Sequence, residues 1–374
     1  MHILHLYKDY APVVGGIENH IRALAEAQAR RGHTVTVLVT GPGPRTAESG
    51  LNGVRVIRAG RWATVASTPL SLDLFRVLGG LRPDITHLQS PYPVGEVAQW
   101  SAGRGRPYVV SYQADVTRAA QRLIMAFYGP LFRALLARAG RVLATTPDFA
   151  RTSPWLRHVQ DRIAVVPLGV DVGRFAPSTS PRPTAATATL LFVGRLRHYK
   201  GLDDLLRALP HVPGRPRLVV AGGGPMRAAW EALSASLGLG EQVRFLGDVP
   251  DDELPALYRS ADVFVLPSTS RAESFGAVLV EAMASGLPCV TTEIGTGTSY
   301  VVQHAVTGLV VPPRSPEALA EALGRLLADP ELRRRFGAAG RARAVQEFAV
   351  EAMVERVEQV YREVLALGPR AYHE

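Results

Sequence analysis

Residues 273–283 read ESFGAVLVEAM, from Glu273 to Met283, and this stretch decides the fold. It follows the short apolar run Val263–Leu266, which predicts a strand. Its own spacing predicts a helix that begins near Phe275. A helix whose N-terminus faces the carboxyl end of a strand forms an anion-binding site. The stretch therefore predicts a parallel α/β protein with a ligand site at the edge of its sheet.

Two carboxylates in this stretch, Glu273 and Glu281, are eight residues apart. Along a helix that spacing covers roughly 12 Å, which is too far for the two acids to share one proton. Carboxylates on either side of an anion site can instead accept hydrogen bonds from sugar hydroxyls. A nucleoside diphosphate sugar carries a ribose diol, a diphosphate and a hexose along its length. It is the ligand that the pair predicts.

The rest of the chain alternates short apolar runs with helical patterns, which favours parallel sheets with helices on both faces. Strands are expected at 3–6, 34–39, 54–57, 85–88, 108–111, 142–144 and 163–166, and then at 189–193, 217–221, 243–246, 263–266, 289–291 and 309–311. Helices are expected at 17–31, and in the second half near 201–208, 225–237, 251–260, 275–285, 315–328 and 347–366.

The alternation of strands and helices is interrupted by segment 176–189, whose Pro, Thr, Ser and Ala content is typical of a linker. We therefore predict an α/β fold of two Rossmann-like, doubly wound parallel-sheet domains, residues 1–172 and 173–350. Two such sheets facing each other would leave a cleft between the carboxyl ends of their strands, where this architecture binds ligands.

The chain has 374 residues, of which 47% are apolar and 20% charged, as in a folded globular protein of two ordinary domains. No apolar run approaches the ~18 residues of a membrane span, and the N-terminal run 1–6 lacks the long apolar core of a signal peptide. The single cysteine, Cys289, is expected in the core. These observations predict a cytoplasmic protein.

The formal net charge of +9 comes entirely from the first half of the chain. Residues 1–172 contain 20 Lys and Arg against 11 Asp and Glu, whereas residues 173–374 contain 22 of each. This excess predicts peripheral attraction to an anionic membrane or to an acidic acceptor, although an arginine-rich composition alone is an alternative. Aromatic residues are not interleaved with the basic ones, which argues against nucleic acid. The stretch 117–141 fits a core helix or a membrane-surface helix pair, broken at Pro130.

Two cations flank one expected loop at the edge of the second sheet. Arg195 follows the strand that ends at Gly194, and Lys200 precedes a helix that starts at Gly201. Two fixed cations beside a helix N-terminus suit a diphosphate, and they would stabilise the charge that grows on a leaving phosphate. The alternative is that both are solvated surface cations.

Glycine-rich turns follow several expected strands. Residues 222–224 and 292–299 are predicted to bring backbone amides and hydroxyls close to the ligand, or to be plain turns. In the first half, Gly15 and Gly16 stand where a loop meets its helix, and their amides are predicted to touch the diphosphate or to shape the acceptor pocket. His20 is expected on the helix surface.

Polar residues also follow the strand at 108–111. Gln113 is expected to face the cleft, and Asp115 either takes part in the site or caps a helix that starts near Thr117. No metal site is predicted, because the chain has no Asp-x-Asp motif and no cluster of Cys and His. A serine hydrolase is not supported, since no Gly-x-Ser-x-Gly elbow occurs.

Taken together, these residues resemble the retaining glycosyltransferases of family 4, which have the GT-B fold. The resemblance covers nearly the whole chain. It rests on Gly194-Arg195 with Lys200-Gly201, on the acid pair around Phe275-Gly276, and on the closing run 307–312.

This resemblance implies that Arg195 and Lys200 hold the donor diphosphate and act in catalysis with Glu273. Glu273 would bind the hydroxyls of the sugar, and Glu281 those of the ribose. Further implied donor contacts are Gly15, Gly16, Gly194, Gly223, Ser274, Phe275, Gly276, Ala277, Val278 and Leu279. The first domain would bind the acceptor and the second the donor, with a C-terminal helix of about 351–374 packing back on the first.

The resemblance also implies transfer with retention of configuration. No metal or other cofactor is expected, because Arg195 and Lys200 would supply the positive charge that a metal otherwise brings. The run 292–301 resembles a subgroup that makes bacterial surface polysaccharides and often uses GDP-mannose. The implied donor is GDP-mannose or a UDP-hexose, and the implied acceptor is a glycan, a lipid-linked molecule or a small molecule.

Two positions depart from the family pattern, because Gln113 and Gln89 stand where histidine is common. Glutamine donates and accepts hydrogen bonds but does not titrate near neutral pH. The substitutions motivate one alternative, a catalytically impaired nucleotide-sugar binding protein. A nucleotide-sugar epimerase on the same fold is a further alternative.

Overall fold

The computed structural model describes the whole chain except residues 14, 66–67, 116–118, 179–186 and 369–374, and the side chains of 119–127. Its contacts divide the chain into two units. Unit 1 comprises Met1–Gly169 with Val350–Glu374, and unit 2 comprises Val170–Ala349. The C-terminal segment therefore belongs to the unit that begins the chain.

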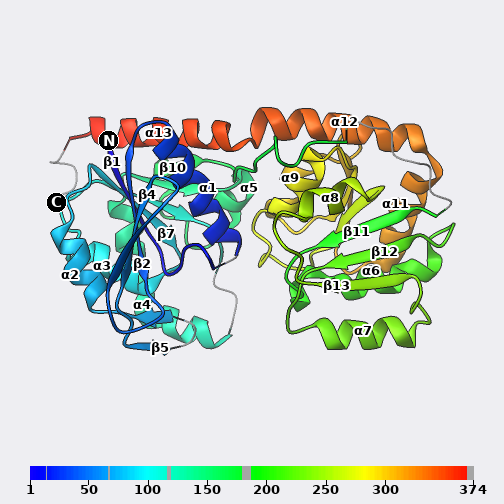
Figure 1. Ribbon diagram of the computed structural model, residues 1–374, viewed down its shortest axis with the longest axis horizontal. Helices are drawn as coiled ribbons and strands as arrows, with labels where there is room; N and C mark the ends of the chain where they lie inside the picture. Colours follow the sequence, from blue (N-terminus) through cyan, green and yellow to red (C-terminus); the bar gives the residue numbers. More distant parts are fainter. Residues whose placement is uncertain (14, 66–67, 116–118, 179–186, 369–374) are drawn as a thin grey trace. The chain divides into compact units, whose positions relative to one another are not determined.

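Unit 1 is built on a sheet with the strand order β10-β9-β8-β7-β1-β2-β4-β3 (Figure 1). Neighbouring strands are parallel except for β3 and β4, which are antiparallel. The strands are β1 His2–Leu6, β2 Thr34–Thr40, β3 Ala47–Leu51, β4 Val54–Ala59, β7 Ile85–Ser90, β8 Tyr108–Tyr112, β9 Arg141–Ala144 and β10 Ile163–Val165. A separate hairpin pairs β5 Ala63–Val65 with β6 Thr68–Leu70.

Helices connect these strands and cover the sheet. They are α1 Gly16–Arg30, α2 Asp73–Gly80, α3 Pro93–Ser101, α4 Ala119–Arg138, α5 Pro147–Thr152 and the C-terminal α13 Val350–Ala366, with a 3-10 turn at Gln160–Arg162. The predicted break at Pro130 is wrong, since α4 continues through it. The described part of α4 buries Phe132 and Leu135, as expected of a core helix.

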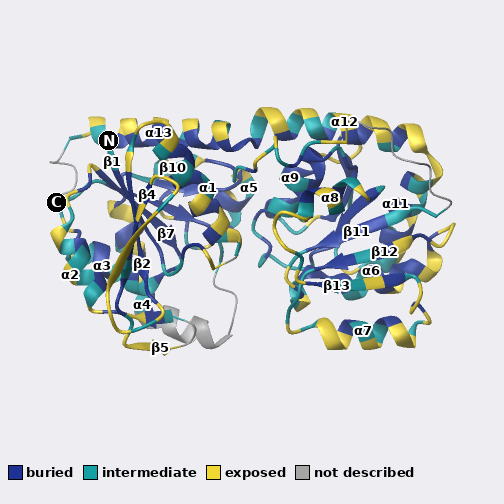
Figure 2. Ribbon diagram, in the orientation of Figure 1, coloured by how far each residue is buried: buried dark blue, intermediate teal, exposed yellow. Residues whose placement is uncertain are grey.

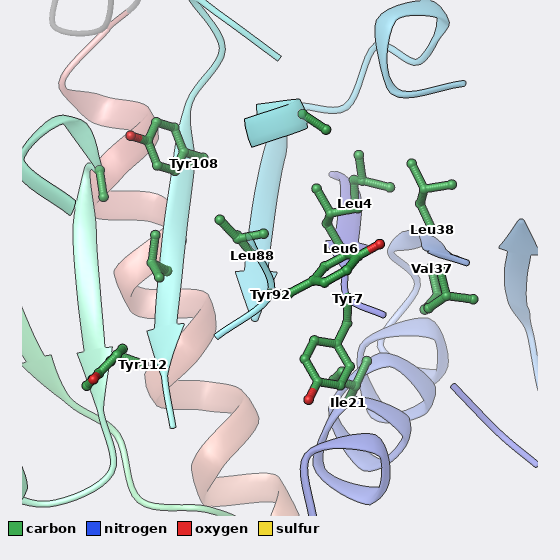
Figure 3. Close-up of a cluster of buried hydrophobic side chains, with 14 of the residues drawn as sticks. Leu4, Leu6, Tyr7, Ile21, Val37, Leu38, Leu88, Tyr92, Tyr108 and Tyr112 are labelled. Carbon is green, nitrogen blue, oxygen red and sulfur yellow. The ribbon is translucent and has the colours of Figure 1, made fainter. Parts of the chain in front are cut away.

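The core of unit 1 lies on both faces of its sheet. Leu4 and Leu6 of β1 join one buried cluster, drawn in Figure 3, while Ile3 joins another. Because successive side chains of a strand point to opposite faces, the two clusters lie on opposite sides of the sheet. Helix α13 packs on the Ile3 side, where the Tyr361 hydroxyl shares a hydrogen bond of 2.6 Å with Nδ1 of His87. This contact ties α13 to the sheet.

Unit 2 is built on a fully parallel sheet with the order β13-β12-β11-β14-β15-β16. Its strands are β11 Thr189–Val193, β12 Arg217–Ala221, β13 Val243–Gly247, β14 Val263–Leu266, β15 Cys289–Thr292 and β16 Gly308–Val311. Cys289 is buried in the core, as expected. Strands β11 and β14 are adjacent, so their carboxyl ends bring residues 194–200 and 267–276 to the same edge.

The helices of unit 2 are α6 Leu202–Ala208, α7 Arg227–Ser236, α8 Leu254–Arg259, α9 Ala277–Ala284, α10 Thr298–Val301, α11 Pro316–Ala328 and α12 Pro330–Glu347, with 3-10 turns at His198–Lys200 and Leu209–His211. Figure 2 shows buried and exposed faces on the long helices. Helix α9 begins at Ala277, two residues later than predicted, so Glu273 lies in the turn before it.

Several elements of the structure were not predicted from the sequence. Helix α12 begins with an Asp329 cap and Pro330, a start signal present in the sequence. Strand β3 and the β5–β6 hairpin carry few buried residues and therefore no apolar run to reveal them. His20, expected on the surface, is buried in α1.

Candidate active site

Lys200 is held at the edge of the unit 2 sheet by the loop that follows β11. It ends a 3-10 turn, and Gly201 next to it adopts the left-handed conformation at a φ of 67°. The lysine side chain is 9% exposed, and its Nζ lies 2.5 Å from Oε2 of Glu273. One predicted cation and one predicted acid therefore meet in a buried ion pair.

The electrostatics of this pair keep Lys200 charged. Burial by itself lowers the pKa of the lysine, but the Glu273 carboxylate beside it raises that pKa, and the net shift is upward. A protonated ammonium group with three N–H donors is thus maintained at the site.

Glu273 is positioned by the turns around it. Ser268 donates a hydrogen bond of 3.4 Å to the carboxylate, and Thr296 donates one of 2.6 Å to the backbone carbonyl of Glu273. The amide of Gly297 donates to the Ser274 carbonyl at 3.0 Å. The acid is therefore fixed from the segments that follow β14 and β15.

Glu281 lies on α9 and is held by Tyr258 of α8, whose hydroxyl donates a hydrogen bond of 2.7 Å to its carboxylate. Burial raises the pKa of Glu281 to about 7, against the opposing effect of the Tyr258 hydrogen bond. The residue as a whole is half-buried. Glu281 thus changes charge near neutral pH.

The backbone amides at the start of α9 are available to a ligand. In the part of the chain that the structure describes, no amide from Ser274 to Val278 donates to a protein acceptor, whereas Leu279 donates to the Gly276 carbonyl at 2.8 Å. Gly276 takes the left-handed conformation, at a φ of 81°. A run of unpaired amides at a helix N-terminus is a binding site for an anion.

The side chains of this turn do not all point to a ligand. Phe275 and Leu279 are buried, and the Phe275 ring packs edge-on against Phe348 with centroids 5.9 Å apart. Any contact that Phe275 and Leu279 make with a ligand is therefore through the backbone. Ala277 and Val278 are half-buried.

Three other predicted residues of unit 2 lie outside the ion pair. Arg195 is exposed, and it makes no side-chain ion pair with any described residue. Gly194 lies under Lys200, because a Cβ built on Gly194 would be 3.5 Å from Nζ. The Gly223 amide donates 2.7 Å to Asp248, so a ligand would have to displace that carboxylate to use it.

The prediction that hydroxyls of 292–299 line the ligand is wrong for three threonines. Thr292, Thr296 and Thr298 are buried and donate to the backbone carbonyls of Ser268, Glu273 and Thr292. Their hydroxyls hold the loop against the β14 turn, so they position Glu273.

In unit 1, Gly15 is the N-terminal cap of α1, and Gly16 is its first residue. A Cβ on Gly15 would lie 2.2 Å from Oε2 of Glu18, so that carboxylate folds over the glycine. Glu18 also lies 4.0 Å from Nζ of Lys8, and burial raises its pKa. Glu18 was not predicted as a site residue, although it lies only two residues after Gly16, which was.

Gln89 and Gln113 form a buried pair in unit 1, in which Nε2 of Gln113 donates 2.6 Å to Oε1 of Gln89. Gln113 also lines a small cavity together with His20 and Ser111. Asp115 accepts hydrogen bonds from the hydroxyls of Tyr112, at 2.9 Å, and Ser153, at 2.6 Å. The predicted helix start near Thr117 lies outside the described residues.

The described residues contain no group of three His, Cys, Asp or Glu that could hold a metal ion. The positive charge at the unit 2 site comes from Lys200 and from amide dipoles.

Comparison with known proteins decides the family. The family described as Glycosyltransferase Family 4 matches residues 14–174, and the one described as Glycosyl transferases group 1 matches residues 181–343. A D-rhamnosyltransferase of Pseudomonas aeruginosa is 36% identical over 93% of this chain and 92% of its own length. The chain belongs to the family 4 glycosyltransferases.

Other relatives of this glycosyltransferase agree. The O-antigen chain mannosyltransferase C of Escherichia coli is 33% identical over 98% of this chain and 99% of its own length. The solved structure of a sucrose-phosphate synthase from Thermosynechococcus elongatus superposes with a TM-score of 0.82 at 25% identity, covering 98% of this chain and 100% of that one. The expected GT-B fold and enzyme class are confirmed for this family 4 glycosyltransferase.

Proposed function

We propose that this glycosyltransferase moves a hexosyl group from a nucleoside diphosphate sugar to a glycan, lipid-linked or small-molecule acceptor, with retention of configuration and without a metal. The observation that carries the proposal is the 2.5 Å contact between Lys200 and Glu273 beside the unpaired amides of 274–278. Cation, anion-binding amides and acid stand together where a diphosphate and a sugar would need them.

The donor would take over contacts that the protein now makes with itself. The diphosphate would accept hydrogen bonds from Lys200 and the α9 amides, and the exposed Arg195 is free to swing onto it. The sugar hydroxyls would donate to Glu273, and the ribose hydroxyls to Glu281. As the glycosidic bond breaks, charge on the leaving phosphate grows beside preplaced donors, which is where they lower the barrier most.

The names of the relatives support a sugar of the manno configuration. One transfers D-rhamnose and the other mannose, and D-rhamnose is mannose without its 6-hydroxyl. We therefore favour GDP-mannose, or a GDP-linked relative of it, over a UDP-hexose. An O-antigen-type glycan in bacterial polysaccharide synthesis is the favoured acceptor.

We place the enzyme in the cytoplasm, with peripheral contact at the inner face of the membrane. No helix among the described residues is long and apolar enough to cross a membrane. The positive charge of residues 1–172 supports contact with an anionic surface.

A thermal-shift panel with GDP, UDP, ADP and TDP tests the donor. The nucleotide that fits should raise the melting temperature most, because a ligand at 100 times its Kd stabilises a protein by about 2.7 kcal/mol. We expect GDP to give the largest shift. A larger shift with UDP would overturn the donor assignment, and no shift with any of the four would overturn the nucleotide site itself.

The affinity for the nucleoside diphosphate is expected to rise about tenfold between about pH 6 and about pH 8, because one linked proton is released. With a pKa of about 7, Glu281 is mostly neutral at the lower pH and ionised at the higher one. Only the ionised carboxylate accepts both ribose hydroxyls. Calorimetry at several pH values measures the change.

The control for this pH dependence is Glu281→Gln, which removes the titrating group and keeps its size. Phosphate of the ligand also titrates, with a pKa of about 6, and that part remains in the variant. Tyr258, Asp251, Arg174 and Lys200 interact with Glu281 and are unchanged in it. An equal pH slope in variant and wild type would remove Glu281 from the site.

A further inference from the structure

Exposed apolar side chains gather on one small element of unit 1. Nine large apolar residues are exposed in the described chain, and four of them fall within residues 62–72. They are Trp62, Val65, Leu70 and Leu72, with exposed fractions of 66%, 58%, 39% and 56%. The other five are scattered over both units. Contiguous exposed apolar residues mark an interaction site, whereas single ones do not.

The hairpin formed by β5 and β6 turns these residues outward. Ala63 pairs with Leu70 and Val65 with Thr68, so these four side chains share one face. Thr64 and Pro69 share the other face, and Pro69 is buried. The hairpin therefore rests on the protein through its Pro69 face and presents Val65 and Leu70 to solvent. Figure 2 draws β5 in the colour of exposed residues.

Leu72 follows β6 as the N-terminal cap of α2 and adds a further exposed apolar side chain next to the hairpin. Trp62 precedes β5, and its amide donates 3.0 Å to the Leu70 carbonyl, which holds it at the open end of the hairpin. We call Trp62, Val65, Leu70 and Leu72 the hairpin patch.

The chain segments next to the hairpin patch carry positive charge. Residues 41–82 contain six arginines and two acids. Arg45 and Arg76 are exposed. The segment that contains Arg45 lies next to the hairpin, because the Arg61 amide donates a hydrogen bond of 2.7 Å to the Gly43 carbonyl. The Glu48 carboxylate pairs with Arg55, and the Asp73 carboxylate accepts a hydrogen bond from Thr46 and keeps its charge. The arginines outnumber the acids, so the chain next to the hairpin has a net positive charge.

We propose that the hairpin patch is the membrane-docking element of this enzyme and inserts its apolar side chains into the surface of an anionic lipid bilayer. An exposed Trp beside Val and Leu suits the boundary between headgroups and acyl chains, and arginines around it suit anionic headgroups.

A second copy of the chain fits this surface less well than lipid. Strands of three residues offer far less than the ~800 Å² per partner of a stable interface. Two identical cationic rims would also repel each other when brought face to face, whereas an anionic bilayer attracts the same rim.

This inference deepens the proposed function, because it rests on a membrane contact for that function and names the surface that makes it. It does not depend on the transfer chemistry. Docking would hold unit 1 at the bilayer, where a lipid-linked acceptor presents its sugar. Vesicle binding needs neither donor nor acceptor, so failure of docking and failure of the transferase assignment are separate results.

The test is co-sedimentation of the full chain with vesicles of phosphatidylcholine, with and without phosphatidylglycerol. Wild type should bind the anionic vesicles at low ionic strength and be released as salt rises. The double variant Val65→Glu/Leu70→Glu should lower the partition coefficient at least about tenfold. Val306→Glu is the matched control, because Val306 is 51% exposed but lies in unit 2, and it should stay within about twofold of wild type.

Folding of the variants is checked by their melting temperatures and by the shift that nucleotide produces. A second readout is tryptophan emission, which should move to shorter wavelength on anionic vesicles and lose that change in Trp62→Phe. Wild type that fails to bind anionic vesicles, or a double variant that binds equally well, would overturn the proposal. So would a dimer in sedimentation that the double variant converts to monomer.

Discussion

Replacing Lys200 with methionine is expected to lower kcat/KM of sugar transfer by about 10²–10³-fold, the usual cost of removing one donor to a developing oxyanion. The methionine keeps the length of the side chain and removes its charge. The structure places Nζ of Lys200 2.5 Å from Glu273 and beside the unpaired amides at the start of α9. No other described cation occupies that position. Initial-rate kinetics with the donor identified by the nucleotide panel measures the effect.

The same substitution also tests the ion pair as a structural element. Without Lys200, the Glu273 carboxylate stays buried and unpaired, and breaking a buried pair costs about 3–5 kcal/mol. The double variant Lys200→Met/Glu273→Gln removes both charges and should recover most of the stability. It should not recover activity. This difference separates a catalytic defect from a folding defect.

Arg207→Met is the matched control for Lys200→Met. Arg207 lies on α6, one turn beyond the same loop, and its side chain is exposed. Its loss should change kcat/KM by less than about twofold, because exposed charges are screened by solvent. Full activity in Lys200→Met, together with a normal nucleotide shift, would show that the leaving group is stabilised elsewhere.

Most strands of the two sheets were predictable because each contains a short apolar run. Val263–Leu266 and Thr189–Val193 are examples, and buried parallel strands require such runs. Strand β3 could not be found in this way, since its residues lie at the sheet edge and are largely exposed. The local signal for a strand disappears where burial no longer demands apolar residues.

The candidate site was predictable only where a local sequence motif indicates its chemistry. Lys200, Glu273 and Glu281 stand in recognisable loops and turns, whereas Tyr258, which holds Glu281, is 23 residues away and lies in an ordinary helix pattern. Its role depends on how α8 packs against α9, and no local signal reports that. The contact of Asp248, which accepts a hydrogen bond from the Gly223 amide, could not be predicted for the same reason.

The second large effect expected is on stability, from Gly201→Ala. Gly201 has a φ of 67°, and a Cβ built there would lie 2.0 Å from the Pro267 carbonyl oxygen. The left-handed conformation costs a non-glycine residue about 1–2 kcal/mol, and a clash with backbone that must move adds about 1–3 kcal/mol more. We expect a loss of about 3 kcal/mol or more in the free energy of unfolding, measured by urea denaturation.

Gly214→Ala separates the two contributions. Gly214 also has a positive φ, 78°, but a Cβ there meets no atom within 4 Å. Gly214→Ala should therefore lower the free energy of unfolding only by the conformational cost of about 1–2 kcal/mol. Equal losses in the two variants would mean that the contact with Pro267 is relieved without cost.

The position of Gly201 also links this stability to activity. Its loop packs against the turn after β14, where the Thr269 amide donates 2.8 Å to the Tyr199 carbonyl. A methyl group at Gly201 pushes that turn away from Lys200, and the same turn leads to Glu273. Gly201→Ala should thus lower activity even at temperatures where it is folded, while Gly214→Ala should not. The close approach of two backbones is what allows a lysine and a glutamate 73 residues apart to meet at 2.5 Å.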